Sequence, residues 1–256
     1  MPLFFRRNST FLDPEAEQWH LESWAWFLAH FGGRADLDLS PLVLPTGSFF
    51  PPSETKGHER ALHILGCVQQ HARMAGWPCS LEAQAESPEL RVGEFTSLKL
   101  DHTQFPAGTF ALAGNEAVVT YDPASVDDPM KLIATLAHEL AHYKLANVAD
   151  EPPGGEDGHE PATDLLTVYL GFGLFGANSA FNFAQHQEVM SQGWSYSRLG
   201  YLSEREWVFA LAVFLTLKRQ PPQQTHRYLK DHLIADLGKA MRYLQKKPAL
   251  LVGLGG

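Results

Sequence analysis

The chain has 256 residues, of which 45% are hydrophobic and 19% charged, a composition typical of a globular protein with a substantial core. Its formal net charge of -9 disfavours nucleic acid as a partner, because phosphate binding needs clustered lysine and arginine. No apolar run reaches the ~20 residues that a membrane-spanning helix needs, and no signal peptide is recognisable, so we expect a soluble cytoplasmic protein with two reduced cysteines.

Two helices and a connector are predicted for the N-terminal third. Residues 13–33 read as an amphipathic helix, with Asp13 as N-cap and Gly32-Gly33 as its end. Residues 40–52 include prolines at positions 41, 45, 51 and 52, and this pattern predicts an irregular connector. A second helix is expected over residues 54–76, with Gly76 as its terminator.

The middle of the chain changes to strand-like patterns. Residues 79–84 and 94–100 are short alternating runs, and residues 108–123 predict a hairpin that turns at Gly114-Asn115. A further helix begins after Asp128 as its N-cap, and the remaining chain is mostly helical. The final "PALLVGLGG" predicts a frayed tail. Helices, a small sheet and more helices together indicate an α+β fold in one domain covering residues 1–256.

The sequence "HELAH" lies within this expected helix and suggests a metal site. Residues four apart lie on one face of an α-helix, so His138 and His142 can direct two imidazole nitrogens at one point. Glu139 lies beside them and can reach a water molecule bound to the metal without being a ligand. A third ligand is needed before the pattern becomes more than a polar face of a helix.

Glu160 is the preferred third ligand, with His159 as the rival. Glu160 and Asp164 are four residues apart at the start of an apolar helical segment. Such a pair can place one carboxylate on the metal and the other on the free N–H of a ligating histidine. Pro161 pushes the preceding residue out of the helical region, so we expect Glu160 at or near the N-cap.

The pattern "HELAH" with "EPATD" 18 residues later resembles the gluzincin branch of zinc metallopeptidases. The strand-like "EAVVTYD" before the motif helix resembles the edge strand of the compact minigluzincins. The resemblance covers roughly residues 80–176. It implies a zincin-like fold, in which a small, mostly antiparallel sheet packs on the HExxH helix. The predicted organisation is an N-terminal helix and connector (1–53), a zincin-like core (54–176) and a helical C-terminal part (177–256), so helices are added at both ends.

The same resemblance implies roles for individual residues. Zn²⁺ would be bound by His138, His142 and Glu160, with Asp164 orienting His138 and Glu139 as the general base. Peptide bonds of a peptide or protein substrate would be hydrolysed by a zinc-bound water. The candidates for oxyanion stabilisation are His186, Tyr196, Arg198 and Tyr201, of which we favour Tyr201 and His186.

Four features are left open by the sequence. The strand around Ala117–Tyr121 could bind an extended peptide by adding it to the sheet. Gly171, Gly173 and Gly176 could let a helix or loop pass close to the site, or could mark a kink. The alternative function is a non-catalytic, zinc-stabilised binding or regulatory protein. In a third hypothesis the HELAH sequence is incidental and the chain is an interaction scaffold. The oligomeric state is not predicted.

Overall fold

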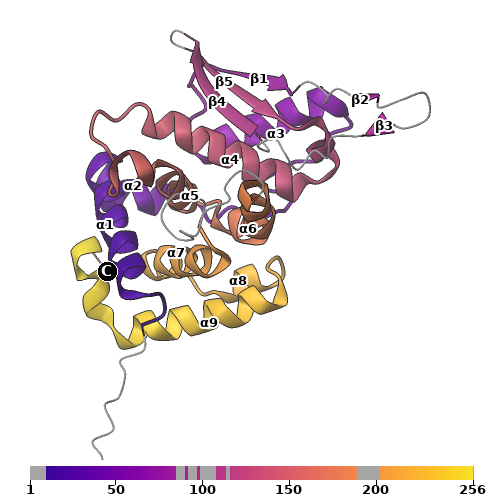
Figure 1. Ribbon diagram of the computed structural model, residues 1–256. Helices are drawn as coiled ribbons and strands as arrows, with labels where there is room; N and C mark the ends of the chain where they lie inside the picture. Colours follow the sequence, from indigo (N-terminus) through magenta and orange to yellow (C-terminus); the bar gives the residue numbers. More distant parts are fainter. Residues whose placement is uncertain are drawn as a thin grey trace, which may run out of the picture.

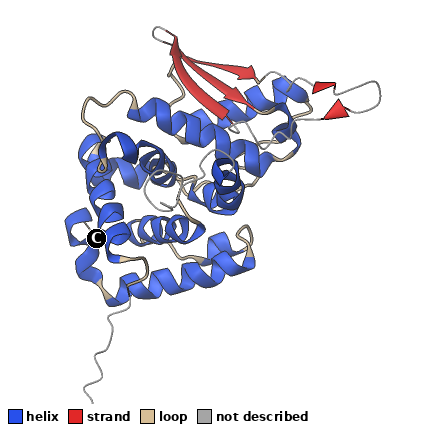
Figure 2. Cartoon of the chain, viewed as in Figure 1, coloured by secondary structure: helices blue, strands red, loops and turns tan. Residues whose placement is uncertain are grey.

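The structure is a computed structural model, and it describes residues 10–84, 90–91, 97–98, 108–113, 116–188 and 202–255. It has a mostly helical α+β fold in which a small three-stranded sheet packs against one helix, α4 (Figures 1 and 2). The α-helices are α1 (Pro14–His30), α2 (Gly33–Leu39), α3 (Gly57–His71), α4 (Pro129–Leu145), α5 (His159–Tyr169), α6 (Gly173–Glu188), α7 (Glu204–Leu217), α8 (Gln223–His226) and α9 (Asp231–Lys246). Among the described residues, no helix is long and apolar enough to cross a membrane.

The N-terminal part confirms the first helix and adds one that the sequence pattern did not predict. Asp13 caps α1 by accepting hydrogen bonds from the backbone N–H groups of Glu15 and Ala16. Gly32 ends this segment in the left-handed region, with φ of 83°, but the chain then enters α2 directly. The pair of glycines therefore joins two helices. A residue in the left-handed region ends one helix and changes the direction of the chain, and a second helix can begin directly after it.

Helix α3 is shorter than predicted. It ends at His71, and the chain leaves it through Arg73, which has a φ of 61°. Gly76 lies beyond the end of the helix. The pattern of apolar residues is confirmed, since Ile64, Leu65 and Val68 are buried.

The sheet has the strand order β1-β5-β4 and is mixed, which corrects the expectation of a mostly antiparallel sheet. Strand β5 (Glu116–Tyr121) pairs parallel with β1 (Cys79–Ala83) and antiparallel with β4 (Gly108–Ala113). The predicted hairpin is the β4–β5 pair. Strand β5 is consequently the central strand, and the expectation that it forms a free edge was wrong. Two short strands, β2 (Leu90–Arg91) and β3 (Ser97–Leu98), form a separate antiparallel pair.

Helix α4 lies at the centre of the fold and carries the HELAH sequence. Asp128 caps it by accepting a hydrogen bond from the backbone N–H of Lys131, as the sequence predicts. Strands β4 and β5 and helices α3, α5 and α6 all contact it, so nearly every face of α4 is covered (Figure 1). Alanines at positions 134, 137 and 141 are buried, and their small side chains allow these neighbours to approach closely.

The C-terminal helices form a layer beyond α5 and α6. Helix α7 packs against α5, α6 and α9, and Gly176 of α6 allows close contact, since a Cβ there would lie 2.2 Å from the Trp207 ring. A Cβ at Gly171 would lie 1.9 Å from the carbonyl oxygen of Pro41, in the predicted connector. Gly176 therefore serves the packing of α6 on α7, and Gly171 lets the connector pass close to the turn between α5 and α6. The last segment is not frayed: it forms a 3-10 helix, η4 (Pro248–Leu254), in which Leu251 and Leu254 are buried.

Candidate metal centre

Helix α4 presents His138 and His142 on one face, one turn apart. Their Nε2 atoms are 3.0 Å apart, and the two rings meet edge to face at an angle of 83°. The His138 side chain is 5% exposed and that of His142 is 22% exposed. One imidazole is thus enclosed while the other borders solvent.

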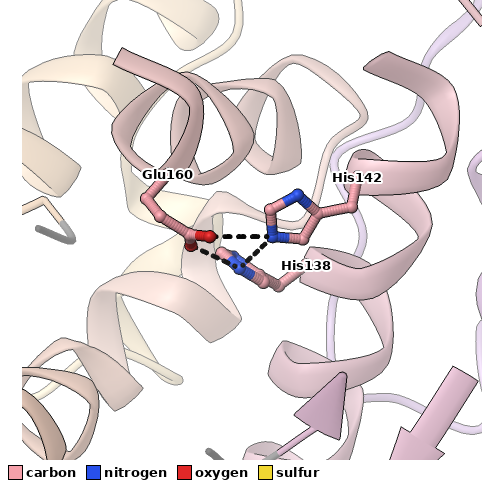
Figure 3. Close-up of side chains that lie close together, drawn as sticks. All are labelled: His138, His142 and Glu160. Atoms are coloured by element: carbon pink, nitrogen blue, oxygen red, sulfur yellow. Dashed lines mark hydrogen bonds and ion pairs between the residues drawn. The ribbon is translucent and has the colours of Figure 1, made fainter. Parts of the chain in front are cut away.

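Glu160 reaches the two imidazoles from α5. Its Oε2 lies 3.4 Å from His138 Nε2 and its Oε1 lies 3.5 Å from His142 Nε2 (Figure 3). Helix α5 begins at His159, so Glu160 is in its first turn and Pro161 follows it within that turn. Proline fits here because the N–H groups of the first turn have no partner in the helix in any case. The sequence constraint on Glu160 is therefore met at the very start of α5.

The donor atoms of His138, His142 and Glu160 have the mutual spacing of a metal site. Ligands held ~2.0–2.1 Å from a tetrahedral zinc are about 3.3 Å apart, and the separations here are 3.0, 3.4 and 3.5 Å. Among the described residues, these three form the one group of histidine, cysteine and acidic side chains that could hold a metal ion. Glu160 Oε2 is shielded from solvent and makes no hydrogen bond. A buried carboxylate oxygen normally has a partner, and a bound metal ion would supply one here. The donor set therefore fits a metal.

Electrostatics also favour a positive charge among these three side chains. Burial alone would lower the pKa of His138, but the neighbouring carboxylates of Asp164 and Glu160 raise it to about 10. Burial alone would raise the pKa of Glu160, but the two histidines hold it well below its usual range. The cluster thus stabilises a cation, in the form of a proton or a metal ion.

Asp164, one turn after Glu160 on α5, fixes the orientation of the His138 ring. Its Oδ1 lies 2.9 Å from His138 Nδ1, and its Oδ2 accepts a hydrogen bond of 2.8 Å from the backbone N–H of Leu202. The carboxylate is 1% exposed. Because an ionised carboxylate only accepts hydrogen bonds, His138 donates from Nδ1, and Nε2 is the ring nitrogen that would bind a metal at the centre of the cluster.

Thr163 contacts the second imidazole and was not singled out from the sequence. Its Oγ1 lies 3.2 Å from His142 Nδ1 and donates a hydrogen bond of 2.8 Å to the carbonyl oxygen of His159. The only sequence signal is its place directly before Asp164. Helix α5 thus supplies three polar groups to this site, spaced i, i+3 and i+4.

Glu139 lies beside the cluster and close to strand β4. Its side chain is buried, and burial raises its pKa, an effect that the positive charge of the histidines opposes. A Cβ placed on Gly108 of β4 would lie 3.0 Å from Glu139 Oε1 and 2.6 Å from the Thr135 methyl group. Gly108 therefore allows the strand to approach the carboxylate closely.

Strand β4 also carries an aromatic ring toward the site. The Phe110 ring lies parallel to that of His142, with 6.4 Å between centroids and an angle of 8° between planes. It also contacts Tyr143 at 5.6 Å. In the described part of the chain, β4 pairs only with β5, so its other side is an edge of the sheet. The edge nearest to the two histidines and Glu139 is consequently β4.

The remaining candidates from the sequence do not join the cluster or cannot be placed. His159 precedes Glu160 on α5 but is not part of the metal-binding group. His186 belongs to α6, with its side chain outside the described part of the structure, and Tyr196, Arg198 and Tyr201 lie outside the described residues. The structure therefore assigns no oxyanion-stabilising side chain.

Comparison with known proteins adds no family to this description. No protein-family model, no curated protein and no solved structure matches the chain. What stands is a cluster of two histidines and one glutamate that could bind a metal, with the spacing of HExxH and a downstream glutamate. Its chemistry is therefore inferred from the geometry of the site.

Proposed function

We propose that the protein is a zinc-dependent hydrolase of peptide bonds. The observation that carries this proposal is the placement of the buried Glu139 carboxylate beside three donor atoms at tetrahedral spacing. His138, His142 and Glu160 would hold the ion. Two imidazoles and one carboxylate are the donor set of catalytic zinc sites, whereas closed structural sites are completed by a fourth protein ligand.

A zinc ion at this position would acidify a water molecule and polarise a substrate carbonyl. Glu139 would take the proton from the attacking water at its carboxylate and deliver it to the leaving amine. Asp164 would hold His138 in the tautomer that leaves Nε2 unprotonated. The partial exposure of His142 and Glu160, 22% and 41% of their side chains, supports access of a substrate from this side.

Strand β4 replaces β5 as the proposed site of substrate binding. An extended peptide can add to a free strand edge through main-chain hydrogen bonds, and β4 is the edge that approaches Glu139 at Gly108. A peptide on this edge would place a backbone carbonyl beside the metal ligands. The substrate class inferred is therefore an extended peptide or an unstructured protein segment.

The test of this function is metal analysis combined with Glu139→Gln. Purified protein is expected to hold about one zinc per chain and to cleave members of a library of internally quenched peptides. Glu139→Gln should keep the zinc and lose activity by ~10²–10⁴-fold, the contribution of a general base. Glu156→Gln is the matched control, because Glu156 is an exposed glutamate in the short 3-10 helix (Gly155–Gly158) between α4 and α5.

Each result separates the competing functions. A wild-type protein that binds no divalent metal would refute the zinc site. Bound zinc with no cleavage of any library member, and no effect of Glu139→Gln beyond that of Glu156→Gln, would support the alternative of a zinc-stabilised binding protein.

A further inference from the structure

The Thr163 hydroxyl lies between the His142 ring and the backbone of its own helix, α5. We infer that Thr163 is a positioning residue that sets the tautomer and orientation of His142 for metal binding. This inference rests on the proposed metal site and assigns a role that the HExxH and downstream glutamate pattern does not include.

The Thr163 hydroxyl has a single hydrogen atom to donate. Thr163 Oγ1 donates to the carbonyl oxygen of His159 at 2.8 Å. Only lone pairs then remain for His142 Nδ1, which lies 3.2 Å away. The ring must therefore be the donor in this contact, with its proton on Nδ1. Its Nε2 keeps a lone pair that points to His138 Nε2 and Glu160.

This arrangement parallels the one at His138. There the acceptor is the Asp164 carboxylate, which also forces the ring proton onto Nδ1. Two consecutive residues of α5 thus control the two imidazoles of α4, one with a carboxylate and one with a hydroxyl. The neutral acceptor makes the weaker hydrogen bond, in keeping with its longer distance of 3.2 Å against 2.9 Å.

Burial makes the hydroxyl difficult to replace by solvent. Thr163 is fully buried, with an exposed fraction of 0%. Removing the hydroxyl would leave the His142 N–H without a partner, which is unfavourable in an enclosed site. The ring can avoid that cost by rotating or by moving its proton to Nε2, and either change removes a lone pair from the metal.

The test measures metal affinity and not activity. Zinc affinity of Thr163→Val is measured by competition with a chromophoric chelator, and the visible absorption spectrum of the Co²⁺-loaded protein reports the ligand geometry. Outer-shell partners of ligating histidines contribute roughly 10–100-fold to metal affinity, so a loss of that size and an altered cobalt spectrum are expected. Thr163→Ser keeps the hydroxyl and should restore both. Thr163→Ala removes it with a smaller side chain and should behave like Thr163→Val.

Thr167→Val is the matched control. Thr167 lies one turn further along α5, is buried, and donates the same type of hydrogen bond to the carbonyl oxygen of Thr163, at 3.0 Å, but forms no hydrogen bond with an imidazole of the described residues. Its zinc affinity should equal that of the wild type. Equal affinities for Thr163→Val and wild type would overturn the inference, as would an equal loss in Thr167→Val or in Thr163→Ser. A wild-type protein that binds no zinc would overturn the proposed function together with it.

Discussion

Replacing Gly108 by alanine tests how closely strand β4 approaches the proposed general base. A Cβ at this position would meet three atoms: the Thr135 methyl carbon at 2.6 Å, the Thr120 carbonyl oxygen at 2.8 Å and Glu139 Oε1 at 3.0 Å. The Gly108 backbone is not in the left-handed region, since its φ is not positive. The effect of the substitution is therefore steric and not conformational.

The size of the effect follows from these distances. The contacts with Thr135 and Thr120 fall short of the 3.4 Å of ordinary contact by about 0.8 and 0.6 Å, and the second is with the backbone of the central strand. Overpacking of this kind costs ~1–3 kcal/mol. Alanine also restricts the unfolded chain, which stabilises the fold by ~0.4–1 kcal/mol. The steric cost is larger, so we expect a net destabilisation of about 1–2 kcal/mol.

Urea unfolding measures the stability, and peptide hydrolysis and zinc affinity are measured on the same variant. Because the new methyl group also displaces Glu139, activity should fall by at least ~10-fold, given that a 1 Å misplacement can cost about 10²-fold. Zinc affinity should not change, since Glu139 is not a proposed ligand. Gly66→Ala on α3 is the control, because no atom lies within 4 Å of the added Cβ. A Gly108→Ala protein as stable as Gly66→Ala would refute this packing of β4 on α4.

Two further predictions concern buried polar groups. Burial lowers the pKa of His20 from 6.5 to about 3, so between these pH values the unfolded chain binds a proton that the folded protein does not. The free energy of unfolding therefore has its full value above pH ~6.5 and decreases as the pH falls toward 3, by at most ~1.4 kcal/mol per pH unit. In urea unfolding between pH 7 and 5, His20→Phe should therefore lose less stability than the wild type, and parallel losses would contradict the assignment. Asp164→Asn has one acceptor for two donors, His138 Nδ1–H and Leu202 N–H, so zinc affinity should fall roughly 10–100-fold; an unchanged affinity in chelator competition would show that Asp164 does not orient the ring.

Features that depend on local sequence were predicted well. Asp13 and Asp128 cap their helices as expected, because an N-cap side chain bonds to backbone N–H groups only two or three residues away. The pairing of β4 and β5 was also recognisable, since the two strands are close together in the sequence, whereas the predicted turn residues Gly114 and Asn115 lie outside the described residues. Such features need no knowledge of the rest of the fold.

The sheet order could not be predicted for the opposite reason. Strand β1 pairs with β5 across more than thirty residues, with Cys79 opposite Ala117 and Ala83 opposite Tyr121. Nothing in the hairpin sequence indicates that a third strand covers β5 and leaves β4 at the edge. The prediction of a frayed C-terminal tail was wrong for the same reason. Leu251 and Leu254 are buried because α1, α7 and α9, which are distant in the sequence or fold back on it, contact η4.

The role of Asp164 could be predicted from the sequence and that of Thr163 could not, and this difference has a physical cause. A carboxylate on an apolar helix is too costly to bury without a partner, so Asp164, which is 1% exposed, implies a donor on the facing helix. His138 is such a donor. The HELAH sequence and the later Glu160–Asp164 pair can therefore be recognised together as parts of one site. A threonine hydroxyl makes no such demand, because it can bond to the carbonyl four residues earlier, as Thr163 does with His159. Its contact with His142 is therefore detectable only once α4 and α5 are placed together.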